Sequence, residues 1–279
     1  MRSSEGELRV ESQEPARLEF EQVTVSYNDH PALSDLTFQV PHGAHVAVVG
    51  PNGSGKSTLF KALVGLLPIR SGRILIHGQP LGDHKDCVAY VPQREEVDWR
   101  FPVTVEDVVL MGRFGRLGWL KPPTQQDRAV VRRSLAQMGI SRLAPRPISE
   151  LSGGQQQRVF MARALAQEPH ILLMDEPFTG VDIATQDATL ELLSQLKEQQ
   201  VTIIVSTHDL SLATGHFDQV LLLNHRLIAY GPPAQVITTQ ALSEAFGGRI
   251  LILPGGGVVV DDCCRPEETG SGEVVAKRI

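Results

Sequence analysis

Residues 45–67 read HVAVVGPNGSGKSTLFKALVGLL, and three features of this stretch predict a phosphate-binding turn. The short apolar run HVAVV is typical of a strand buried on both faces, and KSTLFKALVGLL predicts a helix. Between them, residues 50–57 fit the pattern G-x-x-x-x-G-K-[ST]. Its glycines let backbone N–H groups point inward at phosphate oxygens, and the helix N-terminus adds a positive partial charge.

The lysine and serine that end this pattern have specific expected roles. Lys56 is expected to reach the β- and γ-phosphates of a nucleotide, where it would also serve catalysis, and Ser57 to ligate Mg²⁺. The alternative is a glycine-rich turn that contains a lysine by chance, and the flanking strand and helix argue against it. The candidate binding residues are Gly50, Pro51, Asn52, Gly53, Ser54, Gly55, Lys56, Ser57 and Thr58.

Two carboxylates follow a second apolar run, ILLM at 171–174. Sheets of this class bind ligands at the carboxyl ends of their strands, where Asp175 and Glu176 stand. Asp175 would hold Mg²⁺ directly or through water, and Glu176 would orient and polarise an attacking water. An acidic strand end without function is the alternative, and the phosphate-binding pattern upstream argues against it.

Two polar residues follow other strands of the same sheet. His208 comes after VTIIVS at 201–206, and beside the 171–174 strand it could donate a hydrogen bond to charge developing at the γ-phosphate. Gln93 ends CVAYVPQ, and its amide could ligand Mg²⁺ or water. Taken alone, neither residue type indicates a site. The candidate Mg²⁺ ligands are therefore Ser57, Gln93 and Asp175.

The alternation of strands and helices along the chain predicts an α/β fold with a mostly parallel sheet. An antiparallel β part is expected at the start, where LEFEQVTVSY at 18–27 shows an alternation that slips once, as at a bulge. A helical insert is expected over about 95–165. Within it, a helix begins at Thr104, a loop covers 112–123, and an amphipathic helix follows from residue 125.

The chain divides into three predicted parts. Residues 1–17 form a polar extension, 18–235 the main domain, and 236–279 a C-terminal extension that ends in a flexible tail. Cys263 and Cys264 beside two aspartates resemble a metal site only weakly, and a solvated tail is the other interpretation. The spacing of the 9 histidines shows no metal-binding cluster.

Composition excludes several classes of protein. The 279 residues carry a formal net charge of −6, which argues against a general nucleic-acid binder. No stretch approaches 18 consecutive apolar residues, so we expect no membrane span, and the polar start lacks a secretory signal. The 3 cysteines are a poor disulfide framework and favour a reducing cytosol.

The segment LSGGQQQR at 151–158 gives these motifs a common context. Together with the phosphate-binding turn, Gln93, Asp175–Glu176 and His208, its order in the chain resembles that of the ABC ATPases. The resemblance covers about residues 18–235. It implies ATP and Mg²⁺ as ligands, ATP hydrolysis as the activity, and a second phosphate contact made by the signature residues Ser152, Gly153, Gly154 and Gln155.

The same resemblance implies a dimer and two further site residues. In the family, two chains lie head to tail, and the signature of each contacts the γ-phosphate held by the other. Tyr27 matches the aromatic residue that stacks on adenine, although a core tyrosine on a strand is the alternative. Asp182 matches a loop that crosses the dimer interface, and Thr179-Gly-Val-Asp departs from the common Ser-Ala-Leu-Asp form.

That departure, with VDWRFPVTVEDVVLMGRFGRLGW at 97–119, resembles one branch of the family, the importers of manganese, zinc and iron. The resemblance implies a separate multispanning permease, an extracytoplasmic metal-binding protein, and a cytoplasmic location on the inner face of the membrane. Trp99 and Phe101 are candidates for permease contact, or else core residues of the insert. An importer of siderophores or cobalamin, an exporter, or a soluble ABC ATPase are alternatives.

Overall fold

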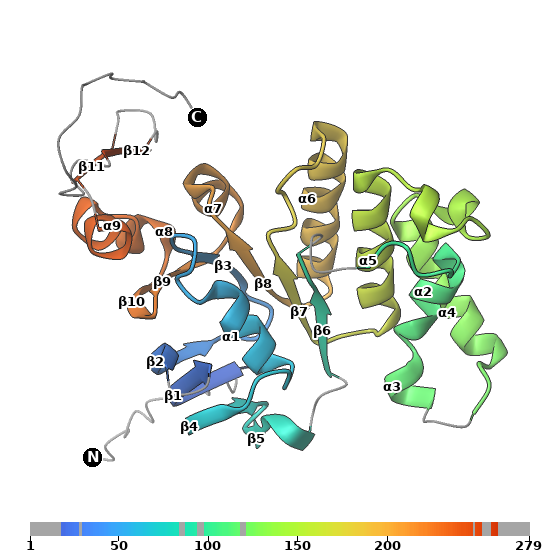
Figure 1. Cartoon of the computed structure of the whole chain (residues 1–279), viewed down its shortest axis with the longest axis horizontal. Helices are drawn as coiled ribbons and strands as arrows, with labels where there is room; N and C mark the ends of the chain where they lie inside the picture. The colour runs from blue at the N-terminus through green and yellow to red at the C-terminus, as the bar shows by residue number, and fades with distance from the viewer. Residues whose placement is uncertain are drawn as a thin grey trace, which may run out of the picture.

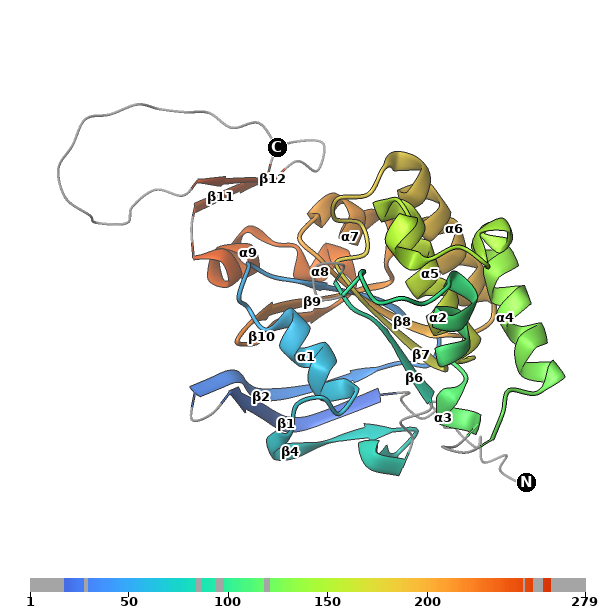
Figure 2. The ribbon, with the colours of Figure 1, turned by 45° about the vertical axis from the view of Figure 1, so that its right-hand side comes forward.

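The chain folds around two sheets of different kinds. The computed structural model describes residues 18–27, 30–83, 87–93, 98–117, 121–247, 249–252 and 258–261. The predicted extension over 1–17, the predicted tail from 262 onward, and Cys263 and Cys264 lie outside the described residues. Figures 1 and 2 show the sheets stacked over one another, with helices on both sides of the larger one.

The larger sheet has six strands in the order β10-β9-β3-β8-β7-β6. The strands β3, β6, β7, β8 and β9 run parallel, and only β10 is antiparallel to its neighbour. The predicted parallel sheet of an α/β fold is therefore confirmed. The bounds are β3 His45–Val49, β6 Val88–Val91, β7 Ile171–Asp175, β8 Thr202–Thr207, β9 Gln219–Asn224 and β10 Arg226–Gly231.

The smaller sheet is antiparallel, in the order β2-β1-β4-β5. Its first strand has an irregular register between Phe20 and Val23, where Gln22 has a φ of 50°, so the predicted slip in alternation is a bulge. A short antiparallel pair of β11 and β12 follows near the C-terminus. The bounds are β1 Leu18–Tyr27, β2 His30–Val40, β4 Ile69–Ile76, β5 Gln79–Pro80, β11 Arg249–Ile252 and β12 Val258–Asp261.

Alternate residues of the parallel strands face two separate cores. Val46 and Val48 of β3 join the core shared with helix α1 (Lys56–Leu63) and the antiparallel sheet. Ala47 and Val49 join the core on the other face. Because successive strand residues point to opposite sides, a strand covered on both faces must be apolar throughout, as HVAVV is.

The other helices cover the second face and the two ends of the molecule. Figure 1 shows α2, α4 and α5 gathered near β6, and α8 and α9 at the opposite end. The bounds are α2 Val105–Met111, α3 Phe114–Leu117, α4 Gln125–Gln137, α5 Gly153–Ala166, α6 Ile183–Glu198, α7 Leu210–His216, α8 Pro233–Val236 and α9 Thr239–Phe246, with 3₁₀ turns at Leu81–Asp83, Ser141–Leu143 and Ile148–Glu150.

The start of α2 agrees with its sequence, and the segment that follows does not. Thr104 caps α2 in a capping box with Asp107, as the predicted start at Thr104 requires. The predicted loop over 112–123 contains the short helix α3 instead. The exact limits of the helical insert, about 95 and 165, stay a prediction.

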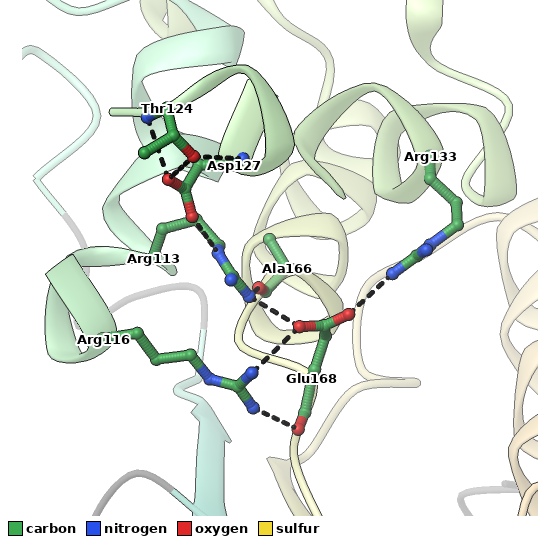
Figure 3. A network of polar contacts seen from close by, with 7 residues as sticks. All are labelled: Arg113, Arg116, Thr124, Asp127, Arg133, Ala166 and Glu168. Carbon is green, nitrogen blue, oxygen red and sulfur yellow. Dashed lines mark hydrogen bonds and ion pairs between the residues drawn. The ribbon is translucent and has the colours of Figure 1, made fainter. Parts of the chain in front are cut away.

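A network of ion pairs explains why α3 is ordered (Figure 3). The Arg113 side chain is 6% exposed, and its guanidinium donates to Asp127 at the start of α4 at 3.0 Å and to Glu168 at 2.8 Å. Arg116 of α3 and Arg133 of α4 also contact the Glu168 carboxylate. These contacts tie α3, α4 and the residue Arg113 before α3 to the segment just before β7. They join residues up to 55 positions apart, so local periodicity could not reveal them.

Candidate functional site

The predicted phosphate-binding turn lies where β3 ends and α1 begins. Gly55 caps α1 with a φ of 101°, in the left-handed region that favours glycine. A side chain on Gly50 would meet the Leu223 carbonyl oxygen of β9 at 2.1 Å. Gly55 is therefore required by its backbone conformation, and Gly50 by the close approach of the turn to β9. The first N–H groups of a helix such as α1 have no partner within the helix and can therefore bind an anion.

Lys56 lies inside the curve of the turn. Its Nζ donates to the carbonyl oxygens of Gly50 at 2.9 Å and Pro51 at 3.1 Å, and the residue is 6% exposed. Burial lowers the pKa of this ammonium, while the nearby Glu176 and Asp175 raise it. The position gives the turn a buried cation that can exchange carbonyl partners for phosphate oxygens.

A cavity of about 510 Å³ opens beside this turn, and we call it the nucleotide cavity. Its walls come from four separate parts of the sequence: the β1–β2 region, the turn with the start of α1, the end of β6, and the end of β7. The lining residues are Tyr27, Ala32, Asn52, Gly53, Gly55, Lys56, Ser57, Thr58, Gln93 and Glu176. The structure thus brings together nine of the predicted residues, since every lining residue except Ala32 was predicted from the sequence.

The two carboxylates at the end of β7 have different surroundings. Asp175 is 1% exposed and accepts hydrogen bonds from the Ser206 hydroxyl and, at 3.4 Å, from the Tyr90 hydroxyl. Glu176 is half-buried, lines the nucleotide cavity, and accepts from the Thr179 hydroxyl at 3.2 Å. Asp175 is therefore fixed behind the cavity, whereas Glu176 faces it.

The backbone of Glu176 is strained. Its φ of 46° is in the left-handed region, which a non-glycine residue occupies at a cost of about 1–3 kcal/mol. The Glu176 N–H donates to the Ser206 hydroxyl at 2.9 Å, and this hydroxyl in turn donates to Asp175. Ser206 therefore holds the Asp175 carboxylate and the backbone of Glu176 in their positions. The sequence did not single it out, although it stands two residues before His208.

The order of the strands places His208 and Gln93 at the same edge. Strand β8 lies between β3 and β7, and Thr207 pairs with Val49, so His208 begins the exposed edge directly beside Gly50. Gln93 follows β6, whose Val91 pairs with Met174, and it lines the nucleotide cavity with Glu176. The expected strand neighbours are confirmed, and His208 itself is exposed and outside the cavity lining.

Tyr27 ends β1 and is not a core residue. It is 46% exposed and lines the nucleotide cavity. The alternative of a tyrosine buried on its strand is therefore wrong. Its ring is available for stacking on a planar ligand group.

The predicted signature residues lie at the start of α5, beside a second cavity. Ser152 caps α5 in a capping box with Gln155, and Gly153 and Gly154 make the first turn of this helix. A side chain on Gly154 would meet the Thr185 hydroxyl at 2.5 Å and Asp182 at 3.2 Å. A cavity of about 440 Å³, the signature cavity, is lined here by Gly139, Ile140, Arg142, Leu143, Ser152, Gly154, Gln155, Arg158, Asp182, Ala184 and Thr185.

Asp182 caps α6 beside the signature residues. Its carboxylate accepts a hydrogen bond from the Thr185 N–H at 2.8 Å. This backbone hydrogen bond is the main cause of the lowered pKa of the Asp182 carboxyl, and a hydrogen bond from the Thr185 side chain adds to it. The loop that holds Asp182 thus packs against the start of α5. The nucleotide and signature cavities have no lining residue in common.

The two aromatic candidates for permease contact have different environments. Trp99 packs edge-on against Phe160 of α5, with ring centroids 5.0 Å apart, and joins the core on that face. Phe101 is 58% exposed. The structure therefore supports the core interpretation for Trp99 and leaves Phe101 as the exposed candidate for permease contact.

Comparisons with known proteins agree with this geometry. The family model described as ABC transporter matches residues 33–179. The manganese transport system ATP-binding protein MntB of Bacillus subtilis is 49% identical over 236 residues, which cover 85% of this chain and 94% of that protein. The zinc transport system ATP-binding protein TroB of Treponema pallidum is 48% identical, covering 84% of this chain and 88% of that protein.

A solved structure gives the same result for the fold. A metal-chelate type ABC transporter in an inward-facing conformation contains a chain that is 30% identical, with a TM-score of 0.75 and coverage of 85% of this chain and 91% of that chain. Within the described ranges, no helix combines the length and hydropathy needed to cross a membrane. The family match, the relatives and the assembled nucleotide cavity lead to one conclusion: this chain belongs to the ABC transporter family, among the subunits that bind and hydrolyse ATP.

Proposed function

We propose that this chain hydrolyses ATP to power the import of a transition-metal ion, manganese, zinc or iron, through a separate membrane subunit. The observation that carries the proposal is the near full-length likeness to ATP-binding proteins of manganese and zinc transport systems, at 49% and 48% identity. The nucleotide cavity supplies the chemistry, and exposed Phe101 supplies a contact for the membrane subunit.

Different residues of the nucleotide cavity bind different parts of the ATP molecule. Tyr27 stacks on the adenine, and the N–H groups of residues 50–58 surround the phosphates. Lys56 exchanges its Gly50 and Pro51 partners for phosphate oxygens, which neutralise the buried ammonium better than carbonyls do. This arrangement positions the γ-phosphate toward Glu176.

The donor set around the turn fits Mg²⁺. The Ser57 hydroxyl, the Gln93 amide and the Asp175 carboxylate all offer oxygen, the ligand atom that Mg²⁺ prefers. Both Asp175 oxygens already accept hydrogen bonds, which favours contact through water. Bound there, Mg²⁺ would neutralise charge on the phosphates during transfer.

Glu176 orients the attacking water and accepts its proton, because its carboxylate faces the cavity and is held by Thr179 and by the strained backbone. His208, at the edge beside Gly50, donates to the charge that develops on the γ-phosphate. These roles need one ionised carboxylate and one ring N–H on the same side of the phosphate.

The separate signature cavity supports a head-to-tail dimer. Ser152 and the first N–H groups of α5 can bind phosphate, yet they share no wall with the nucleotide cavity of the same chain. An isologous dimer would place each signature cavity over the partner's nucleotide cavity and make two equal sites. Asp182, beside the signature, would lie at the interface.

The Glu176→Gln variant tests the ATPase roles. It keeps the shape and the ATP affinity of the site but removes the base, so turnover should fall by about 10²- to 10⁴-fold. With hydrolysis stopped, the variant should sediment as a dimer in ATP and as a monomer in ADP, because ADP lacks the γ-phosphate that joins the chains. Near-normal hydrolysis would exclude Glu176 as the base, and equal mass in both nucleotides would argue against the ATP-joined dimer.

Metal import is tested separately, in cells and with the membrane subunit. The permease and an extracytoplasmic metal-binding protein are expected beside this chain, which would lie on the inner face of the membrane through the permease. Deleting the chain should abolish uptake of one of the three metals, and the intact chain should restore it while Glu176→Gln does not. Unchanged uptake of all three metals would refute the proposal that the cargo is one of these metals, but it would not affect the proposed roles in ATP hydrolysis.

A further inference from the structure

Two histidines far apart in the sequence meet where the two sheets come together. His77 lies in the turn between β4 and β5, where Ile76 pairs with Gln79. His77 has a φ of 52° and Gly78 a φ of 72°, as in a two-residue hairpin turn that ordinarily takes Asn-Gly or Asp-Gly. Histidine is among the non-glycine residues that are enriched at positive φ, so the turn itself accepts it.

His170 is fixed at the start of the strand that carries the carboxylates. Its N–H donates to the Cys87 carbonyl at 2.9 Å, and its own carbonyl accepts from the Thr202 N–H at 3.0 Å, so the backbone is held from both neighbouring strands. The His170 side chain is exposed and that of His77 is half-buried. Water can therefore reach the pair.

The two imidazole rings face each other through one nitrogen each. Nδ1 of His170 lies 3.4 Å from Nε2 of His77, and the ring planes stand at 86°. Two Zn–N bonds of 2.0–2.1 Å at a tetrahedral angle place the nitrogens about 3.4 Å apart. The observed separation is thus the one that a single tetrahedral ion requires, and each ring can keep its proton on its other nitrogen.

We propose that His77 and His170 bind one divalent transition-metal ion, with zinc preferred to manganese. Imidazole suits zinc, copper and nickel, whereas manganese prefers oxygen and stands low in the affinity order for nitrogen ligands. No third His, Cys, Asp or Glu joins the pair among the residues that the structure describes. Water can complete the coordination of a zinc ion that has fewer than four protein ligands. The bound ion would connect the antiparallel sheet to the N-terminal end of β7.

Direct binding to the isolated chain tests the site, and the test does not depend on ATP or on transport. Tag-free protein is titrated with Zn²⁺ against a chromophoric chelator and with Co²⁺, whose visible bands report tetrahedral nitrogen ligation. We expect one ion per chain. His77→Asn, which tolerates the left-handed backbone, and His170→Gln should each weaken Zn²⁺ binding at least about tenfold, because each removes one of the two protein ligands. The double variant, which has neither ligand, should bind Zn²⁺ more weakly than either single variant.

His216→Gln is the matched control, because this exposed histidine lies at the end of α7. It should bind Zn²⁺ as the unmodified chain does, and circular dichroism checks that every variant is folded. If one variant misfolds, the other decides. Equal binding by folded His77→Asn, His170→Gln and the unmodified chain would overturn the proposal. So would the absence of any bound Zn²⁺ in the unmodified chain, which would leave the pair as a hydrogen bond between imidazoles.

Discussion

Ser206→Ala should damage both the stability and the catalytic rate of this ATPase. The Ser206 residue is 0% exposed, and its hydroxyl donates to Asp175 and accepts from the Glu176 N–H. Alanine removes both hydrogen bonds without adding bulk. Among the described residues, it leaves Asp175 with the long contact from Tyr90 at 3.4 Å, and it releases the N–H that holds Glu176 in a strained conformation.

The magnitude follows from these two contacts. A hydrogen bond to a charged group contributes about 1.5–3 kcal/mol, and an unsatisfied buried donor costs about 1–3 kcal/mol. Since part of each loss is relieved by relaxation, we expect the free energy of unfolding to fall by about 3 kcal/mol. A misplaced catalytic group can cost on the order of 10²-fold, so kcat should fall by about 10- to 100-fold. The KM for ATP should change little, because no phosphate ligand is altered.

Urea unfolding gives the stability, and steady-state ATPase kinetics give kcat and KM. Ser194→Ala is the control: this hydroxyl is exposed on α6 and donates to the Leu190 carbonyl at 3.1 Å, so its loss should cost less than about 0.5 kcal/mol and leave kcat unchanged. If Ser206→Ala unfolds more easily but turns over ATP normally, the hydroxyl does not position Glu176. If neither quantity changes, the whole argument from these two hydrogen bonds is refuted.

Three further predictions follow from the same geometry. The variants Ser152→Arg and Lys56→Ala should each be inactive alone. When the two are mixed, part of the ATPase rate should return, because the heterodimer keeps one complete site. No recovery in proven heterodimers would contradict the head-to-tail arrangement. Phe101→Ala should leave folding and the ATPase rate of the isolated chain intact, but it should weaken the free energy of binding to the membrane subunit by about 2 kcal/mol, as followed by co-purification. Trp99→Ala should instead lower the free energy of unfolding by a similar amount. The reverse pattern would refute the assignment of Phe101 to the contact and Trp99 to the core. Burial foremost, with Lys197 assisting, lowers the pKa of His45 to about 4, so the unfolded chain binds more protons below pH 6.5 and stability should fall as the pH drops from 6.5 toward 4. Urea unfolding should therefore show about 2 kcal/mol more loss between pH 7 and pH 5 in the unmodified chain than in His45→Gln, and equal losses would refute this.

Local patterns predicted the parts of the fold that depend on near neighbours. HVAVV must be apolar throughout because both of its faces are covered, and Thr104 caps α2 because its side chain reaches only three residues ahead. The helix α3 was missed for the opposite reason. Its order depends on Arg113 and Arg116 meeting Glu168 across more than 50 residues of sequence, and no local period records that contact.

The same distinction applies to the candidate site. The phosphate-binding turn is one continuous segment, so the residues of this turn that line the nucleotide cavity could be predicted together. Trp99 and Phe101 could not be told apart from the sequence, because Trp99 packs against Phe160, which lies about 60 positions away, whereas Phe101 is exposed. The contact between Ser206 and Asp175 could not be predicted either, since it depends on β8 lying beside β7 in the sheet.

Strand order, more than any single side chain, makes this a site for ATP. Because β8 lies between β3 and β7, the register sets Thr207 beside Val49 and Ser206 beside Asp175. The next residue along each strand then begins the shared edge: Gly50 opens the phosphate turn, Glu176 faces the cavity, and His208 stands between them. A shift of one residue in any of these strands would turn its edge residue to the other face of the sheet. The apolar strands, which carry no chemistry themselves, therefore position the residues that are proposed to act on ATP, and a substitution that alters their register should lower the ATPase rate.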